Sequence, residues 1–593
     1  MIREVTRSVP PATLQELLLR SVDFPAAGLR LVDRNERTSF LSWAGIAERA
    51  AGVAGGLAAL GVEPGERVAL VYPTGAEFFD AFFGILLASA VPVPLYPPVR
   101  LGRLDEYRER TAAMLEAAGA VAVLADRRLM PLLGPALEQA RPRAGCRALG
   151  ELPGGRTLVA AGQADDLALV QFSSGTTVEP KPVALDQRAV LAQVRTLTAL
   201  WPDTPELAHS GVSWLPLYHD MGLIGCVFPA LERPSVLTLL PPEAFVARPA
   251  LWLRALSASR ATISPAPNFA YALAAERVRD DELEGVDLSN WRCALCGAET
   301  VVADTLRRFT ARFAPYGFRA EALTPVYGLS EAALAVTFPP LGRGPRVGRW
   351  ARAPLAEAGR AEPDPEGIEL VSVGAPLAGF RLEVRAPDGA TCAERAVGRL
   401  FVAGPSMMRE YLGRPEATAQ VLAGGWLDTG DLGFLDGGEL FLTGRAKEVL
   451  IVRGRNHAPE EVEHAVDGLD GVRRGCVVAA TQRGDRDSTE RLLLFVERRR
   501  NRAAGLDEEL ATRCRAAVAA AAGLAVDQVV VLAPGTLPRT SSGKMRRGEA
   551  LALHLAGALR PPRRVGWVTL AAELVRGRLA LARAQRSREG GKA

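Results

Sequence analysis

Neither sign of charge dominates this sequence, and it has no long hydrophobic run. The 71 Lys and Arg residues nearly balance the 67 Asp and Glu residues, so the formal net charge is only +4 over 593 residues. This balance gives no reason to expect a nucleic-acid-binding protein. The longest apolar stretch, AFFGILLASAVPVPL at residues 81–95, is too short to cross a bilayer and contains Pro92 and Pro94. We predict no transmembrane segment and interpret this stretch as a buried helix that runs into a strand.

Cysteine is scarce and irregularly placed. Seven cysteines, an odd number, do not make a disulfide framework and fit a reducing compartment. The N-terminus MIREVTRSVPPATLQELLLR lacks the apolar core and small residues of a signal peptide. We therefore predict a cytoplasmic protein. Cys293 and Cys296 form a CxxC motif, but no second pair follows at zinc spacing, and we interpret both as core residues.

The length and the 48% hydrophobic content predict more than one domain. In residues 40–130, helical patterns such as 41–60 alternate with short apolar runs such as VALVY at 68–72, which is typical of an α/β protein with parallel strands. Frequent Gly and Pro within residues 339–368 predict a loop or inserted subdomain with little regular structure. Shorter runs at 374–441 predict a β-rich section.

The last third of the chain predicts a small α+β domain. A strand at 448–452, a helix at 459–466, a strand at 491–496 and a helix at 507–522 follow one another. We predict an N-terminal domain at 1–443, a C-terminal domain at 444–560 and a basic helical tail at 561–593. From Arg560 onward the chain has nine Lys or Arg and two acidic residues. Three interpretations of the tail are open: a membrane-binding helix, a docking helix for a partner, or a cap on the C-terminal domain.

A loop rich in hydroxyl groups follows the strand candidate LALVQF. The segment FSSGTTVEPK at 172–181 can direct backbone N–H groups and hydroxyls at phosphate oxygens, because Gly175 accepts positive φ, and Lys181 adds positive charge. It is not the G-x-x-x-x-G-K-[ST] loop, since Lys181 lies six residues after the glycine. By itself the loop fits an ordinary polar strand-to-helix turn equally well. The candidate phosphate-binding residues are Ser173, Ser174, Gly175, Thr176, Thr177 and Lys181.

Four more motifs follow the loop in order: TPVYGLSE at 324–331, GWLDTGD at 425–431, GRAKEVLIVRGRNHAPEEVE at 444–463 and LPRTSSGKMRR at 537–547. With the loop, they make this sequence similar to the adenylate-forming superfamily of acyl-CoA synthetases, peptide-synthetase adenylation domains and luciferases. The resemblance implies an enzyme that activates a carboxylic acid with ATP as an acyl-adenylate. It also implies a large N-terminal domain of layered α/β subdomains and a small, mobile α+β C-terminal domain.

The resemblance assigns roles to residues in these motifs. Glu331 is the implied Mg²⁺ ligand, since a hard cation prefers carboxylate oxygen, and Thr176 is implied to lie near the metal and the phosphates. Lys544 is the predicted catalytic lysine, a flexible charge that can reach between the α-phosphate and the substrate carboxylate. The C-terminal domain is implied to rotate about a hinge near Lys447 after adenylation. The implied nucleotide-binding residues are Gly297, Ala298, Tyr327 and Gly328 for adenine, and Asp431 and Arg445 for ribose. Without the resemblance, Tyr327 would be interpreted as core and Asp431 as a turn residue.

Within the superfamily, the sequence is most similar to fatty acyl-AMP ligases, which pass the acyl group to the phosphopantetheine thiol of an acyl carrier protein. This likeness depends on VPVPLYPP at 91–98, WLPLYHDMGLIG at 214–225, SPAPNFAYAL at 264–273 and RGRNHAPEEVE at 453–463. Residues 339–368 also lie where these ligases carry an insertion. The likeness implies that His219 and Asp220 lie beside the acyl and adenylate sites, and it makes His219 a catalytic candidate. A structural histidine with its hydrogen bonds satisfied is the alternative. The apolar segments suit the walls of a fatty-acid channel, although ordinary core is an alternative.

Two other functions remain open from the sequence. An acyl-CoA synthetase would differ only in passing the acyl group to CoA. A non-catalytic nucleotide-binding relative is disfavoured, because the chain keeps every charged group that the chemistry uses: Lys181, Glu331, Asp431, Arg445 and Lys544.

Overall fold

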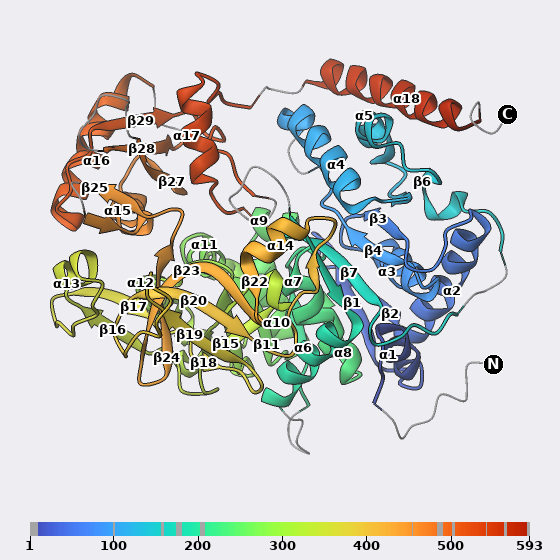
Figure 1. Ribbon diagram of the computed structural model, residues 1–593, viewed down its shortest axis with the longest axis horizontal. Coiled ribbons are helices and arrows are strands. Elements are labelled where there is room, and N and C mark those ends of the chain that lie inside the picture. Colours follow the sequence, from blue (N-terminus) through green and yellow to red (C-terminus); the bar gives the residue numbers. More distant parts are fainter. Residues whose placement is uncertain are drawn as a thin grey trace.

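The computed structural model describes residues 10–98, 101–155, 159–173, 181–201, 208–452, 455–482, 490–500, 504–540, 543–562 and 566–589. They form a large N-terminal domain and a smaller C-terminal domain, which lies at the upper left of Figure 1. The predicted α/β class is confirmed. The boundaries at 443 and 560 stay predictions.

A parallel four-stranded sheet forms one layer near the N-terminus. Its order is β4 (Val91–Pro94), β3 (Arg67–Val71), β5 (Ala122–Ala125) and β6 (Gly145–Arg147). Helix α3 (Ala76–Leu87) is apolar on nearly all sides and is buried against it, as expected for an all-round hydrophobic helix. Strand β4 lies at the edge of the sheet, where its prolines need not complete a ladder on both sides. The predicted helix running into a strand is confirmed.

A second sheet has seven strands and positions much of the site. Its order is β13 (Leu323–Pro325), β12 (Cys293–Gly297), β11 (Ile263–Pro267), β9 (Gly211–Ser213), β10 (Val236–Leu239), β1 (Gly28–Val32) and β2 (Thr38–Ser42). All neighbours are parallel except β1 and β2. Pro267 pairs with Gly297, and Cys296 pairs with Pro325. The carboxyl ends of β11, β12 and β13 therefore reach one edge, which is where ligands bind in open α/β sheets.

The core beneath this sheet is aromatic. Helices α10 (Ala250–Ser259), α11 (Asn268–Arg277) and α12 (Ala303–Phe313) cover it. The side chains of Trp252, Tyr271, Trp291 and Phe309 are fully buried and meet mostly edge to face. This packing makes the edge that holds the site rigid.

The phosphate-loop candidate joins two antiparallel strands and not a strand and a helix. Strands β7 (Leu167–Phe172) and β8 (Pro182–Asp186) pair, and β21 (Glu410–Tyr411) pairs with β8. The N–H of Ser173 donates to the carbonyl of Lys181 (3.1 Å), which closes the base of the loop. The strand-to-helix alternative is therefore wrong.

The predicted β-rich section is an antiparallel sheet, confirmed between residues 381 and 445. It contains β19 (Arg381–Arg385), β20 (Gly398–Ala403), β22 (Leu422–Ala423), β23 (Trp426–Asp436) and β24 (Glu439–Arg445). Strands β23 and β24 form a hairpin in which Asp431 pairs with Arg445.

Residues 339–368 hold more regular structure than their composition predicts. Strand β16 (Val347–Trp350) pairs with β17 (Ile368–Val371), and α13 (Arg352–Glu357) lies between them in the chain. Trp350 is 3% exposed and packs on Phe434 and Phe441, with ring centroids 4.9 and 5.5 Å away. The expectation of little regular structure is wrong because contacts distant in sequence outweigh local Gly and Pro propensity.

The C-terminal domain follows the predicted order of elements. Its strands are β25 (Leu450–Val452), β26 (Arg455–His457), β27 (Val472–Gln482), β28 (Arg491–Arg498) and β29 (Gln528–Leu532). Its helices are α15 (Pro459–Asp467), α16 (Asp507–Ala522) and α17 (Arg547–Leu555). Strands β26, β27 and β29 were not expected from the sequence.

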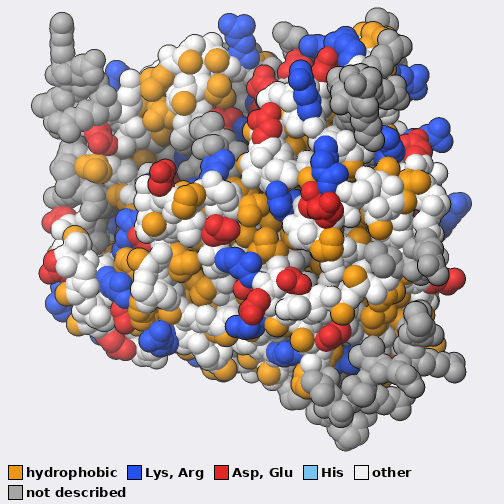
Figure 2. Space-filling model, turned by 45° about the vertical axis from the view of Figure 1, so that its right-hand side comes forward, with side chains coloured by type: hydrophobic (Ala, Val, Ile, Leu, Met, Phe, Trp, Pro, Cys, Tyr) orange, Lys and Arg blue, Asp and Glu red, His pale blue; other side chains and the backbone are white. Residues whose placement is uncertain are grey.

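The basic tail forms helix α18 (Trp567–Glu589), which lies along α5 (Met130–Ala140) of the N-terminal domain (Figure 1). The alternative that it caps the C-terminal domain is therefore wrong. Among the described residues, no helix is long and apolar enough to span a membrane. Positive and negative side chains are interspersed over the face in Figure 2, as the balanced composition predicts.

Candidate active site between the two domains

A cleft of about 3190 Å³ runs between the two domains. Its walls include the ends of β11 to β13, the β23–β24 hairpin and the loop before α17. The lining includes every described residue that the sequence analysis assigned to nucleotide or catalysis, apart from Gly297: Ser173, Lys181, His219, Ala298, Tyr327, Gly328, Glu331, Asp431, Arg445 and Lys544. Ser174, Gly175, Thr176 and Thr177 lie outside the described residues.

Asp431 is held from two sides. The hydroxyl of Tyr327 donates to Oδ2 of Asp431 (2.7 Å), and Nε of Arg445 lies 3.0 Å from Oδ1. Burial raises the pKa of Tyr327 well above its ordinary value, and the charge of Asp431 adds to this, so the phenol remains a donor. A carboxylate has about four acceptor positions. Asp431 can therefore still accept bonds from ribose hydroxyls, and its ribose role stays a prediction.

The backbone at the adenine candidates is closely packed. A Cβ on Gly328 would lie 1.8 Å from the carbonyl oxygen of Leu334, and one on Gly297 would lie 2.8 Å from that of Val326. Ala298 has φ of +67°, a conformation that non-glycine residues seldom adopt. Such strain concentrates at functional sites, which supports the prediction that this turn lies against a ligand.

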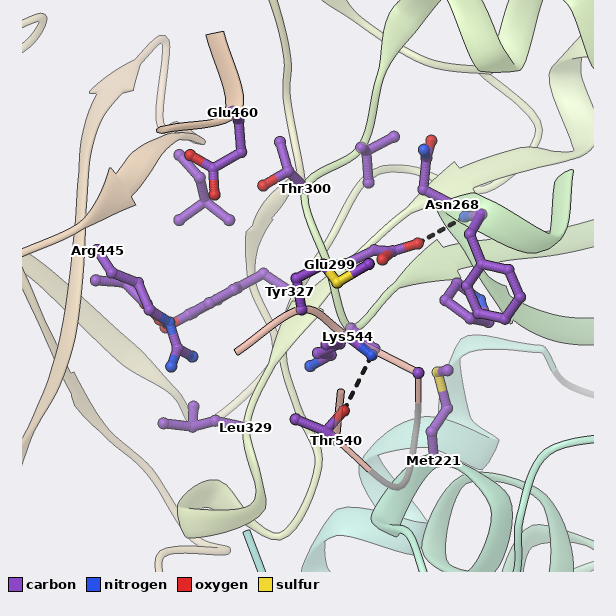
Figure 3. Close-up of a pocket in the computed structure, with 18 of the residues that line it drawn as sticks. Met221, Asn268, Glu299, Thr300, Tyr327, Leu329, Arg445, Glu460, Thr540 and Lys544 are labelled. Atoms are coloured by element: carbon purple, nitrogen blue, oxygen red, sulfur yellow. Dashed lines mark hydrogen bonds and ion pairs between the residues drawn. The ribbon is translucent and has the colours of Figure 1, made fainter. Parts of the chain in front are cut away.

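Lys544 enters the cleft from the C-terminal domain. Its loop is closed by two bonds with Thr540: Lys544 N–H donates to Oγ1 (3.0 Å), and Thr540 N–H donates to the Lys544 carbonyl (2.8 Å). Figure 3 shows Lys544 bordering the same space as Tyr327, Glu299 and Met221. Burial lowers the pKa of Lys544, and the nearby charge of Arg445 lowers it further. A desolvated cation in this place can stabilise developing negative charge, although its catalytic role stays a prediction.

His219 and Asp220 belong to the segment 214–225, and Asp220 connects this segment to the YGLSE motif. Ser330 Oγ donates to Oδ2 of Asp220 (2.6 Å). Burial lowers the pKa of His219 to about 4. The charge of Asp220 raises this pKa and the charge of Lys544 lowers it, but burial has the largest effect. His219 is therefore neutral at pH 7 and can act as a hydrogen-bonding group but not as a fixed cation.

Glu331 belongs to a short 3₁₀ turn, Ser330–Ala332. Its Oε1 accepts a hydrogen bond from the hydroxyl of Tyr411 (2.7 Å). Within the described part of the chain, no three acidic, His or Cys residues cluster as a metal site. One carboxylate nevertheless fits Mg²⁺ that arrives with a nucleotide, because Mg²⁺ commonly binds one or two carboxylates together with substrate phosphates.

Two residues of the site were missed by the sequence analysis. Glu299 accepts from the N–H of Phe269 (2.6 Å) at the start of α11, and burial raises its pKa. Tyr411 contacts both Glu331 and Lys181. Neither lies in a pattern that composition or spacing distinguishes from ordinary core.

The scarcity of lysine is a further sequence signal for the predicted lysines. The chain has only four lysines, Lys181, Lys447, Lys544 and Lys592, and all other basic residues are arginine. Three of the four lie in the motifs. Lysine supplies a compact point charge on a flexible stem, which arginine does not replace.

The sequence matches the family of AMP-binding enzymes over residues 23–412. The chain belongs to this family. It is 34% identical over 548 residues to the long-chain-fatty-acid–AMP ligase FadD26 of Mycobacterium tuberculosis, with 86% of this chain and 91% of that protein covered. It is 33% identical over 524 residues to the medium-chain-fatty-acid–acyl-carrier-protein ligase JamA of Moorena producens, with 84% and 87% covered.

A solved structure from a study of fatty acyl-adenylate ligases of E. coli and L. pneumophila is also similar. It matches with a TM-score of 0.85 and 32% identity, over 93% of this chain and 98% of the other. This AMP-binding enzyme is therefore an ATP-dependent acid ligase that forms an acyl-adenylate.

The hydrogen bond from the Tyr327 hydroxyl to Asp431 can be removed by a single substitution. Tyr327→Phe should raise the KM for ATP about tenfold or more, since a hydrogen bond to a charged group contributes about 1.5–3 kcal/mol. The measurement is pyrophosphate exchange at varied ATP. Tyr316→Phe is the matched control, because the hydroxyl of Tyr316 also donates to an aspartate, Asp280, but at an exposed position. An unchanged KM for ATP would contradict a nucleotide role for Asp431.

Proposed function

We propose that this AMP-binding enzyme is a fatty acyl-AMP ligase. It activates a fatty or related carboxylic acid with ATP, releases pyrophosphate, and transfers the acyl group to the phosphopantetheine thiol of an acyl carrier protein. The observation that supports this most is the entry of Lys544, from the C-terminal domain, into the cleft that holds Asp431, Tyr327 and Glu331. These groups come from distant parts of the chain, and convergence of this kind is expected of a site completed by two domains.

In the first half-reaction, a carboxylate oxygen attacks the α-phosphorus and the bond to the pyrophosphate oxygen breaks. Lys544 neutralises charge between the two anionic reactants, and Asp431 positions the ribose. Glu331 would hold the Mg²⁺ that arrives with ATP, and the metal would neutralise phosphate charge. In the second half-reaction, the thiol sulfur attacks the acyl carbon and AMP leaves.

The proposal of a fatty acid as substrate depends on the apolar wall of the cleft and on the similarity to FadD26 and JamA. Trp214 stacks on Phe245 with ring centroids 3.9 Å apart, and Phe269 lies 6.0 Å from Trp214. Trp214, Phe269 and Met221 all line the cleft. Apolar and aromatic linings favour a hydrocarbon substrate. The names of FadD26 and JamA specify fatty acids of different lengths, so the proposal extends to the class of acid and not to a chain length.

The proposal of an acyl carrier protein as acceptor depends on residues 339–368, the segment that lies where fatty acyl-AMP ligases carry an insertion. Helix α13 within it contacts the C-terminal domain, and Arg352 forms an ion pair with Glu461 of α15. The resemblance implies that such an insertion restricts the domain movement that transfer to CoA needs, and this contact ties residues 339–368 to the C-terminal domain. The contact supports a carrier protein over CoA, as does the name of JamA.

One reaction tests the proposal directly. Purified enzyme, ATP, Mg²⁺ and a panel of fatty acids should give acid-dependent pyrophosphate exchange. Added holo-acyl carrier protein should then yield acyl-carrier protein, whereas CoA should yield little acyl-CoA. Acyl-CoA as the main product would favour the acyl-CoA synthetase alternative, and no exchange with any acid would favour a non-catalytic relative.

The predicted catalytic lysine can be separated from the second half-reaction. Lys544→Ala should lower acid-dependent pyrophosphate release by about 10²–10³-fold, the usual effect of removing one group that stabilises transition-state charge. Thioester formation from supplied acyl-adenylate should remain. Lys592→Ala, at the lysine outside the motifs, is the control. Equal loss of both half-reactions would contradict the assignment.

A further inference from the structure

Tyr411 stands between the two charged groups predicted to serve the phosphates. It is 3% exposed, and its strand β21 pairs with β8, with Tyr411 opposite Val183. Its hydroxyl donates to Oε1 of Glu331 (2.7 Å). The ammonium of Lys181 lies over its ring, 4.7 Å from the centroid. One side chain thus contacts an anion through its hydroxyl and a cation through its ring.

The same segment also fixes the backbone of Glu331. The N–H of Met408 donates to the carbonyl of Glu331 (2.7 Å). Both the backbone and the carboxylate of Glu331 are therefore held by residues 408–411. Because Tyr411 engages Oε1, the carboxylate has a defined orientation.

We propose that Tyr411 is a positioning residue for the metal–phosphate end of the site: its hydroxyl orients Glu331 toward Mg²⁺, and its ring holds Lys181 beside the phosphates. This rests on the proposed function, since Glu331 and Lys181 act there on MgATP. The two contacts use different parts of the side chain. They can therefore be removed one at a time.

The test compares Tyr411→Phe, which keeps the ring, with Tyr411→Leu, which removes both contacts. Mn²⁺ binding to the enzyme with a non-hydrolysable ATP analogue is measured by electron paramagnetic resonance, and metal-free binding of the analogue by calorimetry. Tyr411→Phe should weaken Mn²⁺ binding about tenfold, the size expected for a hydrogen bond to a charged group, and leave metal-free analogue binding unchanged. Tyr411→Leu should weaken both, because the cation–π contact is also lost.

Wild-type Mn²⁺ binding by Tyr411→Phe would overturn the proposal. So would equal loss of metal and analogue binding in both variants, which would indicate general damage to the site. Tyr316→Phe controls for loss of a tyrosine hydroxyl elsewhere, and thermal denaturation checks folding. Failure of the proposed function is distinguishable, since wild-type enzyme would then show no acid-dependent pyrophosphate exchange whatever the variants bind.

A separate observation concerns α18, which leaves the C-terminal domain and packs on the N-terminal one. A Cβ on Gly577 would lie 1.6 Å from the carbonyl oxygen of Pro131, so the two backbones touch. Buried Arg108 forms an ion pair with Glu573 (2.6 Å). Leu574 and Leu581 pack into the core of the N-terminal layer.

We infer that α18 holds the C-terminal domain, and with it Lys544, over the cleft. Residues 556–566 connect α17 to α18 and span at most about 40 Å when fully extended. The C-terminal domain is thus attached to the N-terminal one at both of its ends, through β24 and through α18.

Gly577→Leu should displace α18, because the side chain cannot fit against Pro131. We expect a larger radius of gyration in small-angle X-ray scattering and pyrophosphate exchange lowered several-fold. Arg578→Ala, at the exposed neighbouring position, is the control and should change neither quantity. A chain ending at Pro562 should behave as Gly577→Leu does. Unchanged scattering and exchange in the shortened chain would overturn the inference.

Discussion

The hydrogen-bonded carboxylate of Asp431 joins the parts of the molecule from which the site is built. Tyr327 reaches it from the end of the seven-stranded sheet, and Arg445 reaches it from the last strand before the C-terminal domain. A buried carboxylate is costly unless it is paired on both oxygens. The arrangement therefore fixes the seven-stranded sheet and the β23–β24 hairpin relative to one another.

The position of Lys544 depends on contacts that lie far from it. Arg110 of helix α4 (Leu104–Ala118) pairs with Glu549 of α17 (2.8 Å), and Arg103 donates to the carbonyl of Thr536 (2.6 Å). Inside the C-terminal domain, Arg547 pairs with Glu460 and Glu463 at 2.8 and 2.7 Å. The side chains of Arg110 and Glu549 are only 18% and 11% exposed. This pair and the bond from Arg103, together with α13 and α18, select one orientation of the domain.

Arginine and lysine side chains have different places in this structure. Arginine provides most of the ion pairs between elements, where its planar fork suits carboxylates, while Lys181 and Lys544 are placed where the sequence predicts phosphate contacts. His219, kept neutral by burial, adds hydrogen bonding without adding charge next to Lys544. The cleft thus combines an end with basic side chains and an apolar wall, which suits a ligase that joins a hydrocarbon acid to a nucleotide.

The sequence by itself determined the α/β class, some of the strands and helices, and the residue types of the nucleotide motifs, because periodicity and short motifs are local properties. It could not predict the strand pair around Trp350, whose stability comes from Phe434 and Phe441 far along the chain. Only the tertiary structure decided that Tyr411 lies between Glu331 and Lys181, and that α18 docks on α5. Contacts between residues hundreds of positions apart depend on how the layers pack, and no local pattern encodes that packing.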